Sequence, residues 1–284
     1  MLKSVFDCSK KEIKEILKTL NDDEKNHFLN ERGRFGHNAL KDAKLKKFQL
    51  LVESGIDVNN TDYDGGALFY SDIEKTKILI EHGVNLNKTR VTGNTILFHA
   101  KNTEHATLLI EAGIDINHVN ARGESALFYV DDDVALLLLE KGIDTSIVSE
   151  SSRENALFYS TSKTLYSMIE HGADIHQVSD DHETILFYYA HLGDYDSLAY
   201  LIKQDINMKQ INNKGVTFLN KVKDINKLLS LLDMPELSDQ EYTNTIKLID
   251  YISSYIEKQK ILKNIDKDGK DNIIRKEFEL FFQL

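Results

Sequence analysis

Three acidic residues near the end of the sequence have the spacing of a calcium-binding loop. Asp266, Asp268 and Glu277 stand at the first, third and twelfth positions of such a loop, whose oxygen atoms coordinate Ca²⁺. The loop also needs an oxygen ligand at its fifth position and glycine at its sixth, where this chain has Lys270 and Asp271. Because a lysine ammonium cannot replace a ligand oxygen, we predict that this stretch does not bind calcium.

Other residue types that could support catalysis are not arranged for it. The sequence His-Glu-Thr-Ile-Leu at 182–186 lacks the second histidine of the zinc-protease motif. Cys8 is the only cysteine and lies in a charged segment, so a cysteine nucleophile is not expected. No nucleophile elbow, phosphate-binding loop or dinucleotide fingerprint is present. We therefore expect no catalytic residues, no bound metal and no cofactor.

Two further groups of ionisable residues have structural interpretations that we favour. His82 and His171 precede glycines that are expected to end helices, where a partly positive ring suits the negative end of the helix dipole. The run 131–133 consists of three aspartates and is either a cation site or a helix start. Acidic side chains are favourable at a helix start, so the second interpretation is preferred.

The composition indicates a chain that folds around a sizeable core without disulfides. It has 284 residues, of which 41% are apolar, and one cysteine. The N-terminus lacks the apolar run of a signal peptide, and no stretch approaches the roughly 18 apolar residues of a membrane span. We expect a cytoplasmic protein that does not contact a membrane.

The acidic residues are concentrated in one block. The chain has a formal net charge of −11, whereas residues 104–196 alone contain 18 acidic and 4 basic residues, a net charge of −14. The rest of the chain is therefore slightly basic. A nucleic-acid-binding protein needs a positive surface, so we do not expect direct binding to nucleic acid.

A tetrapeptide recurs with a period of 29 or 30 residues. Ala-Leu-Phe-Tyr occurs at 67–70, 126–129 and 156–159, and the variants at 96–99 and 185–188 fill the gaps. Each unit also has a glycine that is expected to end a helix in the left-handed conformation, and most have a second glycine at a turn. The first set is Gly55, Gly83, Gly113, Gly142 and Gly172, and the second is Gly36, Gly93, Gly123, Gly215 and Gly269.

These units resemble ankyrin repeats. Gly-Ile-Asp-Ile-Asn at 113–117 looks like the family's Gly-Ala-Asp-Val-Asn, and Gly-Asn-Thr-Ile-Leu at 93–97 looks like its Gly-x-Thr-Pro-Leu-His. The resemblance covers roughly residues 30–232. Most units are shorter than the family period of about 33 residues, so we expect that either the first helix or the connection after it is abbreviated. The unit at 185–202 has the full length.

The resemblance implies an all-α fold, an ankyrin-repeat solenoid of helix pairs with short β-hairpin-like fingers. We expect a helical cap at 1–29, about seven repeats at 30–232, and at 233–284 a second helical cap with a degenerate final repeat. Ser9 and Glu12 form a capping box at the start of the first cap. The calcium-like stretch then becomes the turn of the final repeat.

Each short helix carries two adjacent aromatic residues that must point in different directions. Neighbouring helical residues diverge by about 100°, so they cannot share one face. We predict that Phe69, Phe98, Phe128, Phe158 and Phe187 enter the core. Tyr70, His99, Tyr129, Tyr159 and Tyr188 would then line a concave groove. The alternative is that the tyrosines also pack between neighbouring repeats.

The resemblance implies a non-catalytic module that binds another protein. The acidic block favours a basic partner, so we hypothesise a bacterial inhibitory binder of the immunity or antitoxin type, monomeric when alone. The alternatives are an adaptor or secreted effector that docks on a host protein, or an enzyme with an unrecognised site. The predicted partner-binding residues are Tyr70, His99, Arg122, Tyr129, Asp131, Asp133, Arg153, Tyr159, Asp180, Asp181, His182 and Tyr188.

Overall fold

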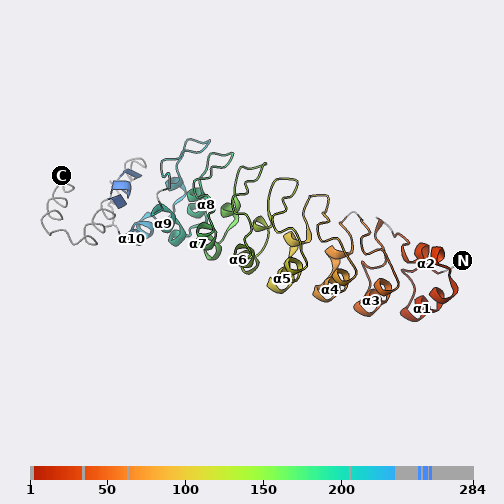
Figure 1. Ribbon diagram of the computed structural model, residues 1–284. Coiled ribbons are helices and arrows are strands. Elements are labelled where there is room, and N and C mark those ends of the chain that lie inside the picture. Colours follow the sequence, from red (N-terminus) through yellow and green to blue (C-terminus); the bar gives the residue numbers. More distant parts are fainter. Residues whose placement is uncertain are drawn as a thin grey trace, which may run out of the picture. The chain divides into compact units, whose positions relative to one another are not determined.

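The chain divides into two compact units, each of which is described on its own. The computed structural model describes residues 3–33, 36–62, 64–204, 206–233, 249–250, 252–254 and 256–257. The first unit comprises Met1–Ser151 and Tyr159–Ala173, and the second comprises Ser152–Phe158 and Asp174–Leu284. In the described ranges the regular elements are helices and no strand occurs (Figure 1). The calcium-like stretch and most of the expected C-terminal cap lie outside them.

The first unit begins with two capped helices, α1 (Lys10–Thr19) and α2 (Asp22–Leu29). At the start of α1, the Ser9 side chain accepts a hydrogen bond from the Glu12 N–H, and the Glu12 carboxylate accepts one from the Ser9 N–H. This reciprocal pair confirms the predicted capping box. Ile13 is fully buried, so the apolar face of α1 packs inward.

From residue 67 onward, the repeats of the first unit each pair a short 3₁₀ helix with a longer α-helix. Asp72 accepts a hydrogen bond from the Lys75 N–H and thereby caps one such α-helix. Neighbouring α-helices pack against each other from α3 to α7, and neighbouring 3₁₀ helices from η2 to η4. The elements are α3 (Leu45–Glu53), η2 (Ala67–Tyr70), α4 (Ile73–Glu81), η3 (Ile96–His99), α5 (Thr103–Glu111), η4 (Ala126–Phe128), α6 (Asp132–Glu140) and α7 (Ser162–Glu170). A further 3₁₀ helix, η5 (Ala156–Tyr159), contributes residues to both units.

Four asparagines, three of them at the end of a helix-ending motif, link one repeat to the next. The Asn87 side chain accepts a hydrogen bond from the Asp115 N–H at 2.9 Å, and Asn117 accepts one from the Asp144 N–H at 2.8 Å. Asn30 and Asn59 make the same bond to the next repeat. We call these four asparagines the asparagine ladder. Their side chains satisfy the backbone N–H groups that lie two residues after the helix-ending glycines.

The second unit contains a helix pair of full length. It comprises α8 (Ile185–Leu192), α9 (Tyr195–Ile202), η6 (Phe218–Lys221) and α10 (Ile225–Leu231). Helix α8 ends at Gly193, which has φ of 76° and lets the chain turn into α9. The prediction of one full-length pair among abbreviated units is therefore confirmed.

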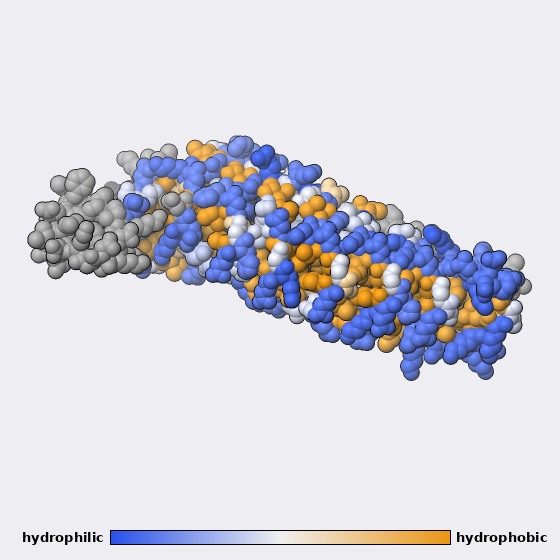
Figure 2. Space-filling model, in the orientation of Figure 1, coloured by the Kyte–Doolittle hydropathy of each residue, from blue (hydrophilic) through white to orange (hydrophobic). Residues whose placement is uncertain are grey.

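The phenylalanines of the recurring tetrapeptide form part of the core, as predicted. All five are buried, with exposed fractions from 2% for Phe187 to 9% for Phe69. The aliphatic residues of the longer helices complete the core, and Figure 2 shows apolar atoms in a strip over α4 and α5, bordered by polar side chains. Within the described ranges, no helix is long and apolar enough to cross a membrane.

Candidate functional site

In the first unit, the aromatic residues that follow each buried phenylalanine form a partly exposed row. The rings of His99, Tyr129 and Tyr159 each pack against the phenylalanine of the preceding repeat. The ring centroids are 5.5 Å apart for Tyr129 and Phe98, and 5.3 Å apart for Tyr159 and Phe128. Tyr129 is nevertheless 37% exposed and Tyr159 47% exposed. Tyr129 and Tyr159 therefore pack between neighbouring repeats and also keep exposed surface, while the concave groove stays a prediction.

The first two residues of this row, Tyr70 and His99, differ in exposure. His99 is exposed and packs on Phe69, with centroids 6.2 Å apart. Burial, with a smaller contribution from Arg90, lowers the pKa of His99. Tyr70 is only partly exposed, and its hydroxyl lies 3.0 Å from carboxylate oxygens of both Asp62 and Asp64. The row therefore offers aromatic surface at Tyr129 and Tyr159 and a polar edge at Tyr70.

The hydroxyl of Tyr70 is hydrogen-bonded to two aspartates of its own repeat, Asp62 and Asp64. Burial and then the hydrogen bonds to Asp62 and Asp64 raise the pKa of Tyr70 far above its ordinary value. Lys41 lies over the Tyr70 ring, 4.6 Å from its centroid, and 3.4 Å from Asp64. Because its hydroxyl is already hydrogen-bonded, Tyr70 presents an anchored ring edge rather than a free donor.

A buried carboxylate, Glu124, organises the finger below Tyr129. It is 5% exposed and accepts hydrogen bonds from the Tyr129 hydroxyl, from Asn120 at 3.0 Å and from Ser149 at 3.2 Å, while Arg122 lies 3.0 Å away. Burial acts to raise the pKa of Glu124, but these bonds outweigh it and leave the pKa lowered. The Tyr129 hydroxyl accepts from Arg122 and Asn120 in return.

The aspartates that begin α6 already have partners. Asp131 caps the helix, since its side chain accepts from the Val134 N–H at 3.0 Å, which confirms the predicted helix start. Asp133 is exposed and pairs with Lys163 at 2.6 Å. These two predicted site residues therefore contribute charge to the surface without being unpaired.

In the second unit, three of the predicted site residues lie together at the tips of two fingers. Arg153, Asp180 and His182 are exposed and line a depression of about 400 Å³ with Val178 and Ser179. The Arg153 Nε lies 3.9 Å from an Asp180 oxygen. These residues form a single cluster of charged and titratable groups.

The other two predicted site residues of the second unit lie outside that cluster's lining. Asp181 is exposed, and its backbone carbonyl accepts from the Asn213 N–H. Tyr188 is half-buried on α8, where its ring meets Tyr189 edge to face at 5.2 Å. Burial raises the pKa of Tyr188.

The remaining ionisable groups have structural roles. Cys8 is 3% exposed, and burial raises the pKa of its thiol, which disfavours the nucleophilic thiolate. The Nδ1 atoms of His82 and His171 each lie 2.8 Å from a carbonyl oxygen in the last turn of their own helix, in line with the structural interpretation. Among the described residues, no cluster of three or more His, Cys, Asp or Glu side chains could hold a metal ion.

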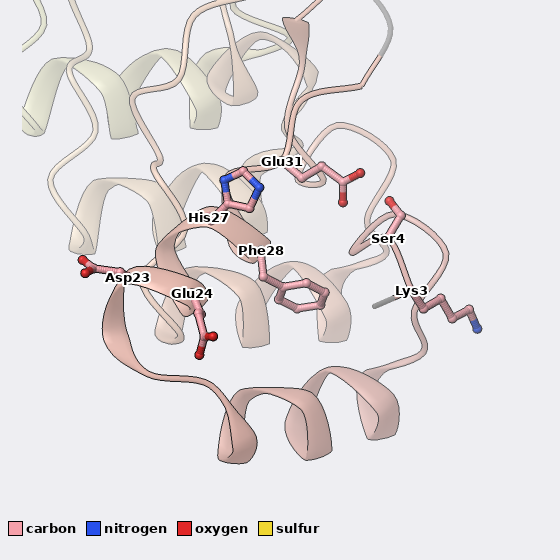
Figure 3. A pocket seen from close by; sticks show the side chains of 7 residues that line it. All are labelled: Lys3, Ser4, Asp23, Glu24, His27, Phe28 and Glu31. Atoms are coloured by element: carbon pink, nitrogen blue, oxygen red, sulfur yellow. The ribbon is translucent and has the colours of Figure 1, made fainter. Parts of the chain in front are cut away.

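A hollow of about 810 Å³ lies beside α2 in the first unit (Figure 3). Phe28 lies on one side of it, and Lys3 and Ser4 come from the segment before α1. Two of its three carboxylates have partners in the protein: Glu24 accepts from the Asn21 N–H, and Glu31 accepts from the Val5 N–H. We therefore assign this hollow no function.

Comparison with known proteins identifies the architecture. No protein-family model and no curated protein sequence matches the chain. Among solved structures, it is similar to the ankyrin repeat domain of Bcl-3, a unique member of the IkappaB protein family, with a TM-score of 0.57 and 18% sequence identity. The match covers 72% of this chain and 100% of that domain.

The chain has the ankyrin-repeat fold. At 18% identity the likeness concerns the fold alone, because one fold can serve many functions. The resemblance inferred from the recurring motifs is thereby confirmed at the level of architecture.

Sequence reasoning missed two features of these ankyrin repeats. Glu124 was not singled out, although it follows a turn glycine and precedes an apolar run, where a charged residue must find partners. Three asparagines of the ladder are visible in the sequence as the last residue of a recurring motif, but their hydrogen bonds to the next repeat are not. Both features depend on contacts between repeats, which the spacing of residues does not reveal.

Proposed function

We propose that this protein is a non-catalytic inhibitory binder that sequesters a basic partner protein, as bacterial immunity and antitoxin proteins do. The ankyrin-repeat fold supports a protein–protein interaction role. The observation that carries the proposal is the pair Tyr129 and Tyr159, whose rings are fixed from below by phenylalanines yet partly exposed. Rigid exposed tyrosines are typical of interface hot spots, because little side-chain entropy is lost on binding.

The charge of the middle repeats supports a basic partner. Residues 104–196 have a net charge of −14, and exposed carboxylates occur in both units, at Asp133 and at Asp180 and Asp181. A surface of one sign accelerates the association of an oppositely charged protein and disfavours partners of the same sign. We further propose that the protein is monomeric when alone and that it is cytoplasmic; the single cysteine of the chain supports the second part, because it fits a reducing compartment.

The decisive experiment isolates the partner and then measures its binding kinetics. The tagged protein is captured from the cell that encodes it, and the co-purified protein is titrated against variants. Replacing Tyr129 or Tyr159 with alanine should raise the dissociation rate and cost about 2 kcal/mol of binding free energy if these residues are hot spots. Tyr166→Ala is the matched control, because Tyr166 is as exposed as Tyr129 but lies on α7, outside the row.

Charge-neutral variants test the steering part of the proposal. Asp131→Asn, Asp180→Asn and Asp181→Asn should mainly slow association, and added salt should remove the difference. Asparagine is chosen because it caps a helix about as well as aspartate and so preserves the start of α6. Unchanged binding of the tyrosine and aspartate variants at low salt would place the interface elsewhere and refute the proposal.

The alternative role, an adaptor or secreted effector, would use the same exposed tyrosines. The identity of the captured protein separates the two. A basic toxin made by the same cell supports the inhibitory role, whereas a protein of another organism supports the effector role.

A further inference from the structure

Each finger of the repeats turns through a residue with left-handed backbone conformation, and in two neighbouring fingers this residue is not glycine. Gly93, Gly123 and Gly215 have φ of 81°, 73° and 72° at this position. Arg153 and His182 occupy the equivalent position with φ of 56° and 59°. Both of these residues belong to the second unit.

The turn itself does not need either side chain. The His182 N–H donates to the Ser179 carbonyl at 2.9 Å, as the Gly215 N–H donates to the Asn212 carbonyl at 2.9 Å. Arginine and histidine pay a steric cost in the left-handed region that glycine avoids. The fold therefore tolerates these two side chains at some loss of stability, and their presence points to another use.

Both side chains line the same depression, which is about 400 Å³ in volume. Its walls are fixed by hydrogen bonds between the two fingers. The Asp180 N–H donates to the Ser152 carbonyl at 2.9 Å, and the Gln177 side chain donates to the Arg153 carbonyl at 2.5 Å. The site is thus held in place by the backbone and is large enough to receive one side chain.

The guanidinium of Arg153 is not satisfied by its acidic neighbour. Its Nε lies 3.9 Å from the Asp180 carboxylate, beyond hydrogen-bond distance, and the two side chains are 69% and 57% exposed. An exposed ion pair of this kind is weak. Guanidinium is the protein group best suited to bind a carboxylate through two parallel hydrogen bonds, and an imidazole N–H beside it supplies another donor.

We propose that this depression binds a carboxylate group of the protein partner, either from one of the partner's acidic side chains or from the partner's C-terminus. The inference rests on the proposed protein-binding function. The surrounding acidic residues attract the basic partner, and the Arg153–His182 depression then selects where one carboxylate of that partner must lie. The positive Arg153 guanidinium within an acidic surface fixes the position of the bound partner and makes binding specific. A partner without a carboxylate at that point would leave the guanidinium with only its weak pair to Asp180.

The test titrates small carboxylate probes into the full-length protein. Binding is detected by NMR, through the signals of the Arg153 side chain and the His182 ring. The probes are N-acetyl-glutamate amide for a side-chain carboxylate and an N-acetylated dipeptide for a terminal one. Inorganic phosphate serves as the competing free anion. We expect saturable shifts with at least one carboxylate probe and affinity at least about tenfold lower in Arg153→Gly. Lys214→Gly, which removes an exposed cation from another finger tip of the same unit, should bind like the parent.

The same variants give a second, independent readout. If the side chains serve binding and not folding, Arg153→Gly and His182→Gly should raise the thermal midpoint while lowering affinity for the probe. Three binding results would overturn the inference: no probe binds saturably, Arg153→Gly binds as the parent does, or phosphate binds more tightly than either carboxylate. One stability result would also overturn it, namely that both glycine variants are destabilised. Binding of an oligolysine peptide to the parent and to Asp131→Asn, a residue outside the depression, is measured in parallel and tests the acidic surface alone, so the proposed function and this inference can fail separately.

Discussion

The first helix of a repeat has two different lengths in this protein: one repeat of the second unit has a full α-helix, whereas the η6 repeat of that unit and the repeats of the first unit from residue 67 onward have a 3₁₀ turn. In the first unit, this helix is a single 3₁₀ turn such as η3 (Ile96–His99), and the chain leaves it directly after the aromatic pair. In the second unit, α8 (Ile185–Leu192) continues for another turn and brings Tyr189 and Ala190 into the core, both with 0% exposure. A full helix thus buries apolar surface that the short one cannot.

The shorter repeats replace that surface with polar contacts between neighbours. The asparagine ladder joins backbone N–H groups of one repeat to side chains of the previous one, and Glu124 gathers Asn120, Arg122, Tyr129 and Ser149 around one buried carboxylate. Directional hydrogen bonds contribute less per contact than buried aromatic side chains, but they fix geometry more strictly. The exposed aromatic row lies in the unit that uses them.

The largest expected effect tests whether the longer helix gives the tighter core. Tyr189→Ala should cost about 3–5 kcal/mol of unfolding free energy, because it removes a fully buried aromatic ring. Tyr159→Ala in the first unit should cost about 1 kcal/mol, since the ring is 47% exposed and packs on one face only. Urea unfolding with residue-resolved hydrogen exchange measures both. Equal losses would show that the two aromatic positions are energetically equivalent.

The next effect concerns the polar centre of the first unit. Glu124→Ala should destabilise that unit by about 2–3 kcal/mol, since several buried donors lose their acceptor. Glu140→Ala, at the exposed end of α6, is the control and should be near neutral. Because the folded pKa of Glu124 is lowered, its contribution is present above its unfolded pKa and is lost as pH falls through the folded pKa. A parent–variant difference that stays constant below about pH 4 would contradict this assignment.

A smaller effect measures one rung of the asparagine ladder. Asn117→Ala should cost about 1 kcal/mol, because the Asp144 N–H loses its acceptor. Ser146→Ala is the matched comparison: the Ser146 hydroxyl donates to Asp144 within its own turn and makes no such link between repeats. We expect a smaller loss there, measured by the same urea midpoints. If Ser146→Ala costs as much as Asn117→Ala, the ladder has no special role.

The smallest effect is a difference in acid sensitivity. His105 in α5 is fully buried, and burial, with a contribution from Lys101, lowers its pKa. The unfolded chain therefore binds a proton that the folded first unit does not, so stability is complete above the unfolded pKa and falls as pH drops below it. His99 acts with the same sign.

Hydrogen exchange in α5 between pH 7.5 and pH 5.5 tests this. The parent should lose protection in α5 on acidification, and His105→Gln should lose less. The same change at His82, which is exposed, should leave the parent's pH dependence intact. Identical pH slopes in the parent and His105→Gln would remove His105 as the source.

The sequence by itself determined the repeat architecture of this protein. Motif spacing placed the helix-ending glycines, the buried phenylalanines and the one full-length repeat, because each of these depends on local backbone conformation or on the side-chain period of a helix. These signals recur in register, so each copy of the motif supports the assignment of the others.

Only the tertiary structure decided which polar groups meet. Glu124 became buried and multiply hydrogen-bonded because its neighbours in other turns surround it, and the tyrosines proved to be both packed and exposed because a ring has two faces. The depression shared by Arg153 and His182 likewise could not be inferred from the sequence. It is formed by the tips of two neighbouring fingers, which lie one repeat apart along the chain. Contacts between repeats depend on register and distance in space, which residue type and spacing do not specify.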